Sequence, residues 1–290
     1  MPPDYHAYSQ ASHQVMDRLR QVTPLVEQIS IDEAFLDVSD LPDEPDLIAR
    51  QLQERIRAEL ELPCSLGIAA NKLVAKIATD VGKVANRGSG PPNALTRVQA
   101  GHEAEFLAEL PTIALWGIGP KTAARMAELG INTIGQLAGW SEGDLVRLFG
   151  KHGHDLYSHA RGIDDRPVET SHEIKSISRE TTYARDVSDP AVLDNTLREL
   201  VESVGNQLRK EGFSGTTIKL KLRWPDFTTL TRQVTLPAPT NQDEIIYQAA
   251  RKLFTDTWQS PRKARLIGVG ISGFEQSLRQ LSLWEDKDER

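Results

Sequence analysis

The stretch EQISIDEAFLDVSD, residues 27–40, places two adjacent carboxylates, Asp32 and Glu33, inside a run that otherwise has the pattern of a buried strand. Side chains of a strand alternate between its two faces, so apolar residues on one face share either odd or even numbers. The apolar positions are odd before the pair and even from Ala34 onward. This change of parity predicts a tight turn or a bulge at the pair, and therefore a hairpin.

The residues at this interruption are not the glycine, asparagine or proline that turn geometry favours. Two neighbouring carboxylates repel by roughly 1 kcal/mol in water and about 4 kcal/mol at an effective dielectric constant of 20. A divalent cation would reverse that cost. A metal site and a solvated acidic turn both remain open from this stretch alone.

The composition describes an ordinary globular protein with room for several domains. The chain has 290 residues, of which 39% are hydrophobic and 26% charged. No apolar run approaches the ~20 residues that span a bilayer, and the first residues, MPPDYHAYSQ, do not have the pattern of a signal peptide. A single cysteine, Cys64, excludes a disulfide framework and a thiolate metal cage. We expect a buried thiol in a cytoplasmic protein.

The net charge of −7 is unevenly distributed. Residues 1–62 hold 13 acidic and 5 basic residues, so the acidity is concentrated around the carboxylate pair. The remainder is nearly neutral with local basic clusters, which is compatible with contacts to phosphate groups.

Two amphipathic helices are predicted on either side of the hairpin, over residues 7–22 and 46–60. The run LPCSLGIAANKLVAKIATDVGK predicts a strand, a loop and a helix that carries Lys72, Lys76 and Lys83. Lysines along such a helix suit a polyanion, although a solvated lysine face is the commoner meaning of this spacing. The Gly/Pro loop at 86–93 is the first candidate boundary.

Residues 101–166 have the pattern of a small helical unit with a helix-hairpin-helix motif. Gly117 and Gly119 form a turn before Pro120, which begins a helix, and Lys121 follows. Glycines at a helix start allow backbone amides to approach a phosphate closely without reading bases. The alternative is a helical corner without a ligand.

Residues 175–273 predict the order βαββαβ, which indicates a four-stranded sheet backed by two helices. Strands are expected at 175–187, 216–224, 227–236 and 262–273, with helices at 190–212 and 241–257. Apolar and basic residues alternate from Ile218 to Trp224. The outward face would then carry cations that could follow a sugar-phosphate backbone: Lys219, Lys221, Arg223 and Arg232. The alternative is a solvated, exposed sheet face.

Three of these segments together resemble one family. SIDEAFLDVSD at 30–40, SLGIAANKLVAKIATDVGK at 65–83 and the helix-hairpin-helix at 116–124 are similar to the motifs of Y-family DNA polymerases, in the same order. The resemblance implies a multidomain α+β fold. Its expected parts are a partial palm with the end of the fingers at 1–100, a helix-hairpin-helix thumb at 101–168, a βαββαβ little finger at 172–275 and a tail at 276–290.

The resemblance also implies template-directed DNA synthesis across damaged bases, with primer-template DNA and dNTP as substrates and two Mg²⁺ ions as cofactors. It makes Asp32 a metal ligand, Glu33 its catalytic neighbour and Lys83 a contact for the triphosphate, although the loop after Lys83 departs from the family pattern. Asn71, Lys72 and Lys76 would shape the palm, and Asp37 would be structural. It also implies a contact of Arg179 with the template backbone, whereas the DNA contacts expected for Gly117, Gly119, Lys121, Lys219, Lys221 and Arg223 rest on the patterns described above.

The tail resembles the short peptide that docks bacterial polymerases on the sliding clamp. Gln280 is followed by Leu281, Leu283 and Trp284 in a polar terminus, where no fold element obliges them to be buried. The alternative is a tail that packs on its own domain.

In the resembling family, the first catalytic aspartate and most of the fingers precede the position that matches Met1. We therefore expect an incomplete metal site and little primer extension by this chain, as a monomer in the cytoplasm, associated with the nucleoid. Two other functions remain open. One is a noncatalytic module that binds DNA and the clamp, and the other is a helix-hairpin-helix nuclease with Asp32 and Glu33 as its metal site.

Overall fold

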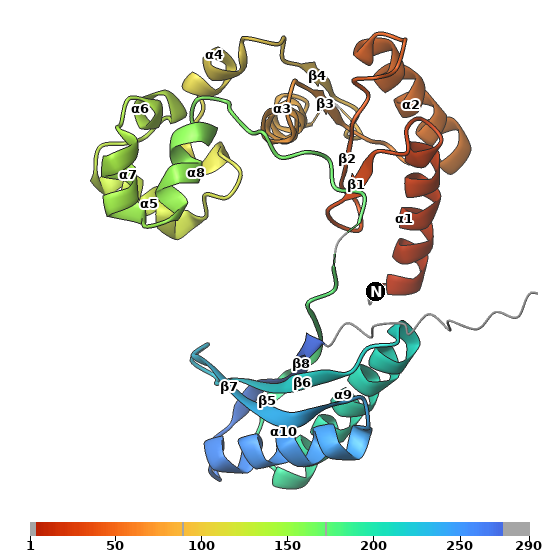
Figure 1. Ribbon diagram of the computed structural model, residues 1–290, viewed down its shortest axis with the longest axis vertical. Coiled ribbons are helices and arrows are strands. Elements are labelled where there is room, and N and C mark those ends of the chain that lie inside the picture. Colours follow the sequence, from red (N-terminus) through yellow and green to blue (C-terminus); the bar gives the residue numbers. More distant parts are fainter. Residues whose placement is uncertain (1–3, 89, 172, 275–290) are drawn as a thin grey trace, which may run out of the picture. The chain divides into compact units, whose positions relative to one another are not determined.

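The computed structural model describes residues 4–88, 90–171 and 173–274, and these form two compact units, Met1–His172 and Glu173–Arg290. Figure 1 labels the elements of both units. None of the helices within the described residues is long and apolar enough to cross a membrane.

The first unit begins with α1 (Tyr5–Arg20), which packs against α2 (Pro45–Leu60) across the small core of Met16, Leu19, Val26, Leu52 and Ile56. Between the two helices lies the predicted hairpin, made of β1 (Val26–Gln28) and β2 (Ala34–Leu36). Cys64 lies half-buried beside this core, and burial raises the pKa of its thiol.

A parallel strand pair follows, β3 (Leu66–Ile68) with β4 (Leu95–Arg97), joined through α3 (Lys72–Ala85). The loop at 86–93 is therefore a connection inside this unit. Gly67 and Gly82 allow α3 to lie close to the strands, because a Cβ at Gly67 would come within 2.0 Å of the Ala75 carbonyl oxygen.

The predicted helical unit consists of short helices around one core. They are α4 (Glu103–Ala108), the 3₁₀ helix η1 (Thr112–Ala114), α5 (Pro120–Glu128), α6 (Ile134–Ala138), α7 (Glu142–Phe149) and α8 (His152–His159). Their buried residues share a cluster with Leu73, Val74 and Ile77 of α3. The core thus crosses the expected boundary at residue 100, and separate palm and thumb domains remain a prediction.

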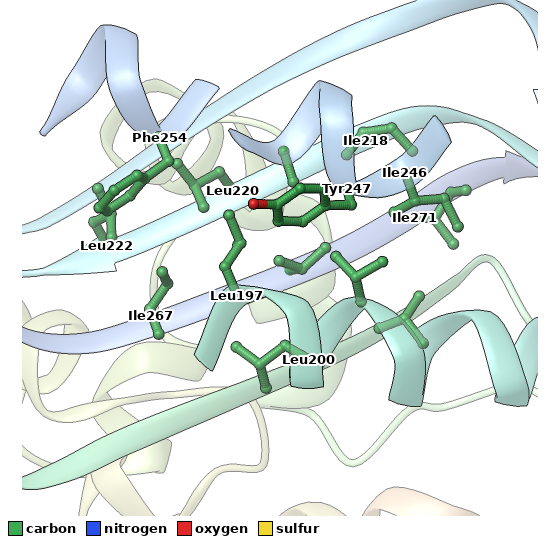
Figure 2. Packing of buried hydrophobic residues seen from close by; sticks show 14 of the residues in the cluster. Leu197, Leu200, Ile218, Leu220, Leu222, Ile246, Tyr247, Phe254, Ile267 and Ile271 are labelled. Carbon is green, nitrogen blue, oxygen red and sulfur yellow. The ribbon is translucent and has the colours of Figure 1, made fainter. Parts of the chain in front are cut away.

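The second unit has the predicted βαββαβ order. Its elements are β5 (Ser176–Val187), α9 (Pro190–Glu211), β6 (Gly215–Arg223), β7 (Thr229–Thr240), α10 (Asp243–Thr257) and β8 (Ala264–Phe274). The strands form an antiparallel sheet in the order β5-β8-β6-β7. Ile218, Leu220 and Leu222 point toward residues of α9 and α10 such as Leu197 and Phe254 (Figure 2).

Strand β7 extends beyond the predicted end at residue 236. Pro237 and Pro239 indicate a strand end in the sequence, because proline cannot donate to a sheet ladder. In the structure β7 lies at the edge of the sheet and needs only one hydrogen-bonded neighbour, so both prolines are tolerated.

Candidate active site and nucleic-acid interface

The carboxylate pair lies in the turn of the β1–β2 hairpin, as the change of parity predicts. Val26 pairs with Leu36 and Gln28 with Ala34. The backbone N–H groups of Ile29 and Ser30 both donate to the carbonyl oxygen of Glu33, which closes the turn. The Ser30 hydroxyl donates to Asp32 Oδ1 at 2.6 Å. The turn is therefore held by local hydrogen bonds and leaves Asp32 exposed.

Two lysines of α3 face this turn. Lys76 Nζ lies 2.9 Å from Glu33 Oε1 and 3.0 Å from Asp80, and Lys83 Nζ lies 3.9 Å from the same Glu33 oxygen. Burial alone lowers the pKa of Lys76, but its hydrogen bonds to Glu33 and Asp80 raise it further than burial lowers it. The arrangement keeps positive charge beside the carboxylates. The structure thus brings together Asp32, Glu33 and Lys83.

The pair also borders a cavity of about 230 Å³ inside the first unit. Its walls are mostly apolar residues of α1, α2, β2 and β3, and its polar lining includes Asp32, Glu33, Lys76 and Lys83. Strands β2 and β3 belong to separate two-stranded sheets, and residues of both line the cavity. Polar groups with opposite charges therefore gather at a hollow in an otherwise apolar region.

The donor set suits a hard cation only in part. Carboxylate oxygens are the ligands that Mg²⁺ prefers, and one or two of them together with substrate phosphates commonly hold this ion. Within the described ranges, no group of three or more Asp, Glu, His or Cys side chains could hold a metal. Two carboxylates alone would leave part of the coordination of such an ion to phosphate oxygens.

A buried ion pair lies at the base of the hairpin, and sequence reasoning did not identify it. Lys72 Nζ donates to Glu27 Oε2 at 2.6 Å, and both side chains are less than a tenth exposed. The same Glu27 oxygen accepts the backbone N–H of Glu169 at 2.9 Å. This pair joins the hairpin, α3 and the segment after the helical region. The sequence shows Glu27 in a strand pattern, but it does not show that its partner is Lys72, 45 residues away.

A second polar network joins the start of α3 to the segment after α8. Asp164 accepts hydrogen bonds from the Leu73 backbone N–H and from the Arg166 guanidinium, at 2.6–3.2 Å. Asn71 caps α3 by accepting from the Val74 N–H and donates to the Gly162 carbonyl oxygen. The geometry of Asn71 and Lys72 agrees with the expected structural role. Asp37 likewise accepts the Ser39 backbone N–H within its own turn.

The helix-hairpin-helix turn has the predicted local form. Gly117 has φ +97°, which favours glycine, and Gly119 precedes Pro120 at the first position of α5. Gly119 and Lys121 are exposed. The first N–H groups of α5 have no partner within the helix, so this turn presents donors beside a lysine.

The second unit presents the predicted basic row on one face of its sheet. Ile218, Leu220 and Leu222 are buried, whereas Lys219 is exposed between them. Lys219 pairs in register with Gly270 and Lys221 with Gly268, so the neighbouring strand adds no bulk. Lys221 Nζ lies 2.7 Å from Glu180, and Arg223 Nε donates to the Thr229 hydroxyl.

Arg232 does not belong to this face, and its expected position there is wrong. It pairs in register with Leu220, whose side chain is buried in the core beneath α9 and α10. Directly opposed residues of an antiparallel pair share a face, so Arg232 lies on the helix side at the sheet edge. Sequence alternation within one strand cannot fix the register of its neighbour.

Arg179 also lies apart from the basic row. It pairs with Val269, which is buried with Leu220 in the core, so Arg179 is on the helix side of the edge strand β5. It borders a shallow polar depression with residues of α9 such as Glu202 and Asn206. The expected clamp contacts, Gln280, Leu281, Leu283 and Trp284, lie outside the described residues.

Sequence models of known families match most of the chain. Residues 1–80 match the impB/mucB/samB family, and residues 174–283 match the impB/mucB/samB family C-terminal domain. Residues 113–164 match the model described as DNA polymerase-iota, thumb domain. The three matches coincide with the carboxylate hairpin, the sheet unit and the helix-hairpin-helix.

Curated relatives carry the name DNA polymerase IV. The protein from Desulfatibacillum aliphaticivorans is 40% identical over 91% of this chain and 66% of its own length. The protein from Akkermansia muciniphila is 39% identical over 96% of this chain and 76% of its own length. The chain thus spans about two thirds to three quarters of these relatives.

Solved structures show the same fold. The Y-family DNA polymerase chimera Dbh-Dpo4(243-245)-Dbh has a TM-score of 0.79 at 24% identity, covering 93% of this chain and 77% of its own. A structure titled "Insertion ternary complex of Dbh DNA polymerase" has a TM-score of 0.61, also at 24% identity, with the same coverage.

Proposed function

The chain belongs to the impB/mucB/samB family of Y-family DNA polymerases, and from this membership we propose that it takes part in template-directed DNA synthesis across damaged bases. Its substrates are primer-template DNA and dNTP. The helix-hairpin-helix nuclease is set aside, because family membership explains the same motif.

One observation carries this proposal. Asp32 and Glu33 of the hairpin meet Lys76 and Lys83 of α3 at a single cavity, although the two segments are more than 40 residues apart. Carboxylates beside lysines suit the meeting of a divalent cation with a triphosphate. A solvated acidic turn would not need lysines from another element.

The residues at this cavity have distinct roles in the proposal. Asp32 is the metal ligand, and Glu33 is its acidic neighbour. When bound at Asp32, Mg²⁺ would supply activation of the primer 3′-hydroxyl and charge neutralisation at the triphosphate. Lys76 orients Glu33 through its hydrogen bond. Lys83 binds a triphosphate oxygen, because its amine is half-exposed and only 3.9 Å from Glu33.

DNA is held by phosphate contacts on both units. The turn with Gly117, Gly119 and Lys121 presents amide donors and a cation, and the β6 face presents Lys219, Lys221 and Arg223. The tail residues Gln280, Leu281, Leu283 and Trp284 dock on the sliding clamp. The protein acts as a monomer in the cytoplasm at the nucleoid.

A second candidate is a noncatalytic module that binds DNA and the clamp. It is favoured by the small donor set, since Asp32 and Glu33 are the only carboxylates that line the cavity in the part of the chain that the structure describes. A module of this kind needs the helix-hairpin-helix turn, the β6 face and the tail, but not Asp32.

Primer extension with Asp32→Ala tests the proposal. Little extension is expected of the unmodified chain, and the Asp32→Ala variant should lose what Mg²⁺-dependent extension there is, because it loses transition-state stabilisation. Its Kd for primer-template DNA should stay within about twofold, because phosphate contacts are unchanged. Asp40→Ala, an exposed aspartate in the same segment, is the matched control and should change neither quantity.

Two outcomes contradict the assignment. Full extension by the Asp32→Ala variant would remove Asp32 from the metal site. DNA binding by the unmodified chain without any extension, in Mg²⁺ or Mn²⁺, would favour the noncatalytic module.

A further inference from the structure

The loop that joins β6 to β7 (Figure 1) holds a bulky residue in an unfavourable backbone conformation. Trp224, Pro225, Asp226 and Phe227 form a turn in which the Phe227 N–H donates to the Trp224 carbonyl oxygen. Phe227 has φ +64°. This region of backbone space favours glycine, and a bulky residue there is an outlier.

Folding gains little from the phenylalanine at this position. The residue is 64% exposed, so burial of apolar surface does not offset the strained backbone. The ring is accompanied by the Arg265 guanidinium, whose central carbon lies 4.5 Å from the ring centroid. A strained, exposed side chain indicates that its use lies outside the folded unit.

The surroundings of the ring are mainly basic. Arg223 ends β6, Arg262 lies over the Trp224 ring at 4.0 Å, and Lys263 is exposed two residues before Arg265. Two carboxylates lie nearby. Asp226 accepts the Thr228 backbone N–H, and Asp186 lies 3.6 Å from Arg265. Four cations against two carboxylates leave this tip positively charged.

We propose that the β6–β7 tip binds a single-stranded nucleotide, with the Phe227 ring stacked on an unpaired base. Every base has a π face, so one exposed aromatic ring serves any sequence, and neighbouring arginines bind the phosphates on either side. The basic surroundings favour a nucleic acid over a protein partner. The inference rests on the DNA binding proposed above and adds to it a contact to unpaired template beside the duplex.

Substitutions at residue 227 distinguish the effect of the ring on DNA binding from its effect on folding. The full chain and the variants Phe227→Gly, Phe227→Trp and Ile245→Ala are titrated with two labelled DNAs, a blunt duplex and the same duplex with a ten-nucleotide single-stranded overhang. Glycine removes both the ring and the strain, and tryptophan keeps a stacking ring. Ile245, exposed on α10, is the matched apolar control.

The expected results differ for each variant. Phe227→Gly should raise the melting temperature, because glycine adopts positive φ without strain. It should weaken binding of the overhang DNA by about 5-fold to 100-fold and leave the blunt duplex within about twofold. Phe227→Trp should restore overhang binding, and Ile245→Ala should bind both DNAs as the unmodified chain does.

Other outcomes overturn the inference. Equal binding of the overhang DNA by Phe227→Gly would show that the ring does not stack on a base, and equal loss on both DNAs would show a general phosphate effect. If the Phe227→Gly variant bound both DNAs normally and lost only its binding to a purified sliding clamp, the tip would be a protein contact. If the unmodified chain bound neither DNA, the proposed function itself would fail.

Discussion

At the scale of single residues, buried charges explain how the first unit holds its hairpin. Glu27 and Lys72 pair at 2.6 Å with both side chains buried and join the hairpin to α3, whereas the buried Asp164 pairs with the half-exposed Arg166 at the start of α3. Burying such charges costs desolvation free energy, so these pairs fix the positions of the segments that they join more than they add to net stability. The sequence shows the separate charged residues, but the pairing partners are fixed only by the tertiary fold.

Substitution of Asp164 should make the stability depend less on pH. Burial alone raises the pKa of this carboxyl, but the hydrogen bonds and charge of Arg166 lower it below its ordinary value. The folded carboxylate therefore binds fewer protons than the unfolded one, and its contribution is present above the unfolded pKa and lost as the pH falls through the folded pKa. Asp164→Asn should lower the free energy of unfolding by about 1.5–3 kcal/mol at pH 7.

Denaturant unfolding at several pH values measures this difference. The gap between the unmodified chain and Asp164→Asn should shrink as the pH falls below the ordinary aspartate range, because both side chains are then neutral. Asp165→Asn, at the exposed neighbouring position, should leave the free energy of unfolding unchanged within about 0.5 kcal/mol. A gap that is constant over the whole pH range would contradict the role of the ion pair.

At the scale of elements, periodicity predicts most of the structure. The alternation in β6 and the helical patterns of α2, α3 and α9 depend on burial within one element, and the structure confirms them. The position of Arg232 and the length of β7 depend on neighbouring strands, so a pattern along one segment could not reveal them. The same holds for the site. The carboxylate turn could be predicted from its own segment, but the lysines beside it come from another element and could not.

The β6 face should set the salt dependence of DNA binding. Lys219→Ala, Lys221→Ala and Arg223→Ala together remove the three cations of the basic row, each of which releases counterions when it binds a phosphate. The slope of log K against log salt should become less negative by up to about 0.9 for each lost contact on duplex DNA. Fluorescence anisotropy titrations at several salt concentrations measure this slope.

Arg232→Ala is the matched control for the triple variant. The residue is also an exposed cation of the same sheet, but its register places it on the helix side. It should leave the slope unchanged. If Arg232→Ala flattened the slope as much as the triple variant, total charge and not the β6 face would govern DNA binding.

At the scale of the whole molecule, the proposed metal, DNA and clamp contacts lie in different parts of the chain. The first unit holds the carboxylate cavity and the helix-hairpin-helix turn, and the second holds the basic sheet face. Each has its own buried core. A change in one unit can therefore be expected to leave the folding of the other intact, which makes the DNA and clamp contacts separately testable.

Removal of the tail should separate clamp binding from DNA binding. Leu281, Leu283 and Trp284 form an apolar cluster between polar residues, and such spaced anchors with a terminal aromatic fill pockets on a partner. A chain without residues 280–290 should lose binding to a bacterial sliding clamp in surface plasmon resonance and keep its DNA affinity within about twofold, because the proposed phosphate contacts lie elsewhere. A chain without residues 285–290 alone keeps the apolar cluster and loses only charged residues, so it should still bind the clamp. Equal clamp binding by the longer truncation, or equal loss by the shorter one, would show that these apolar side chains are not the docking contact.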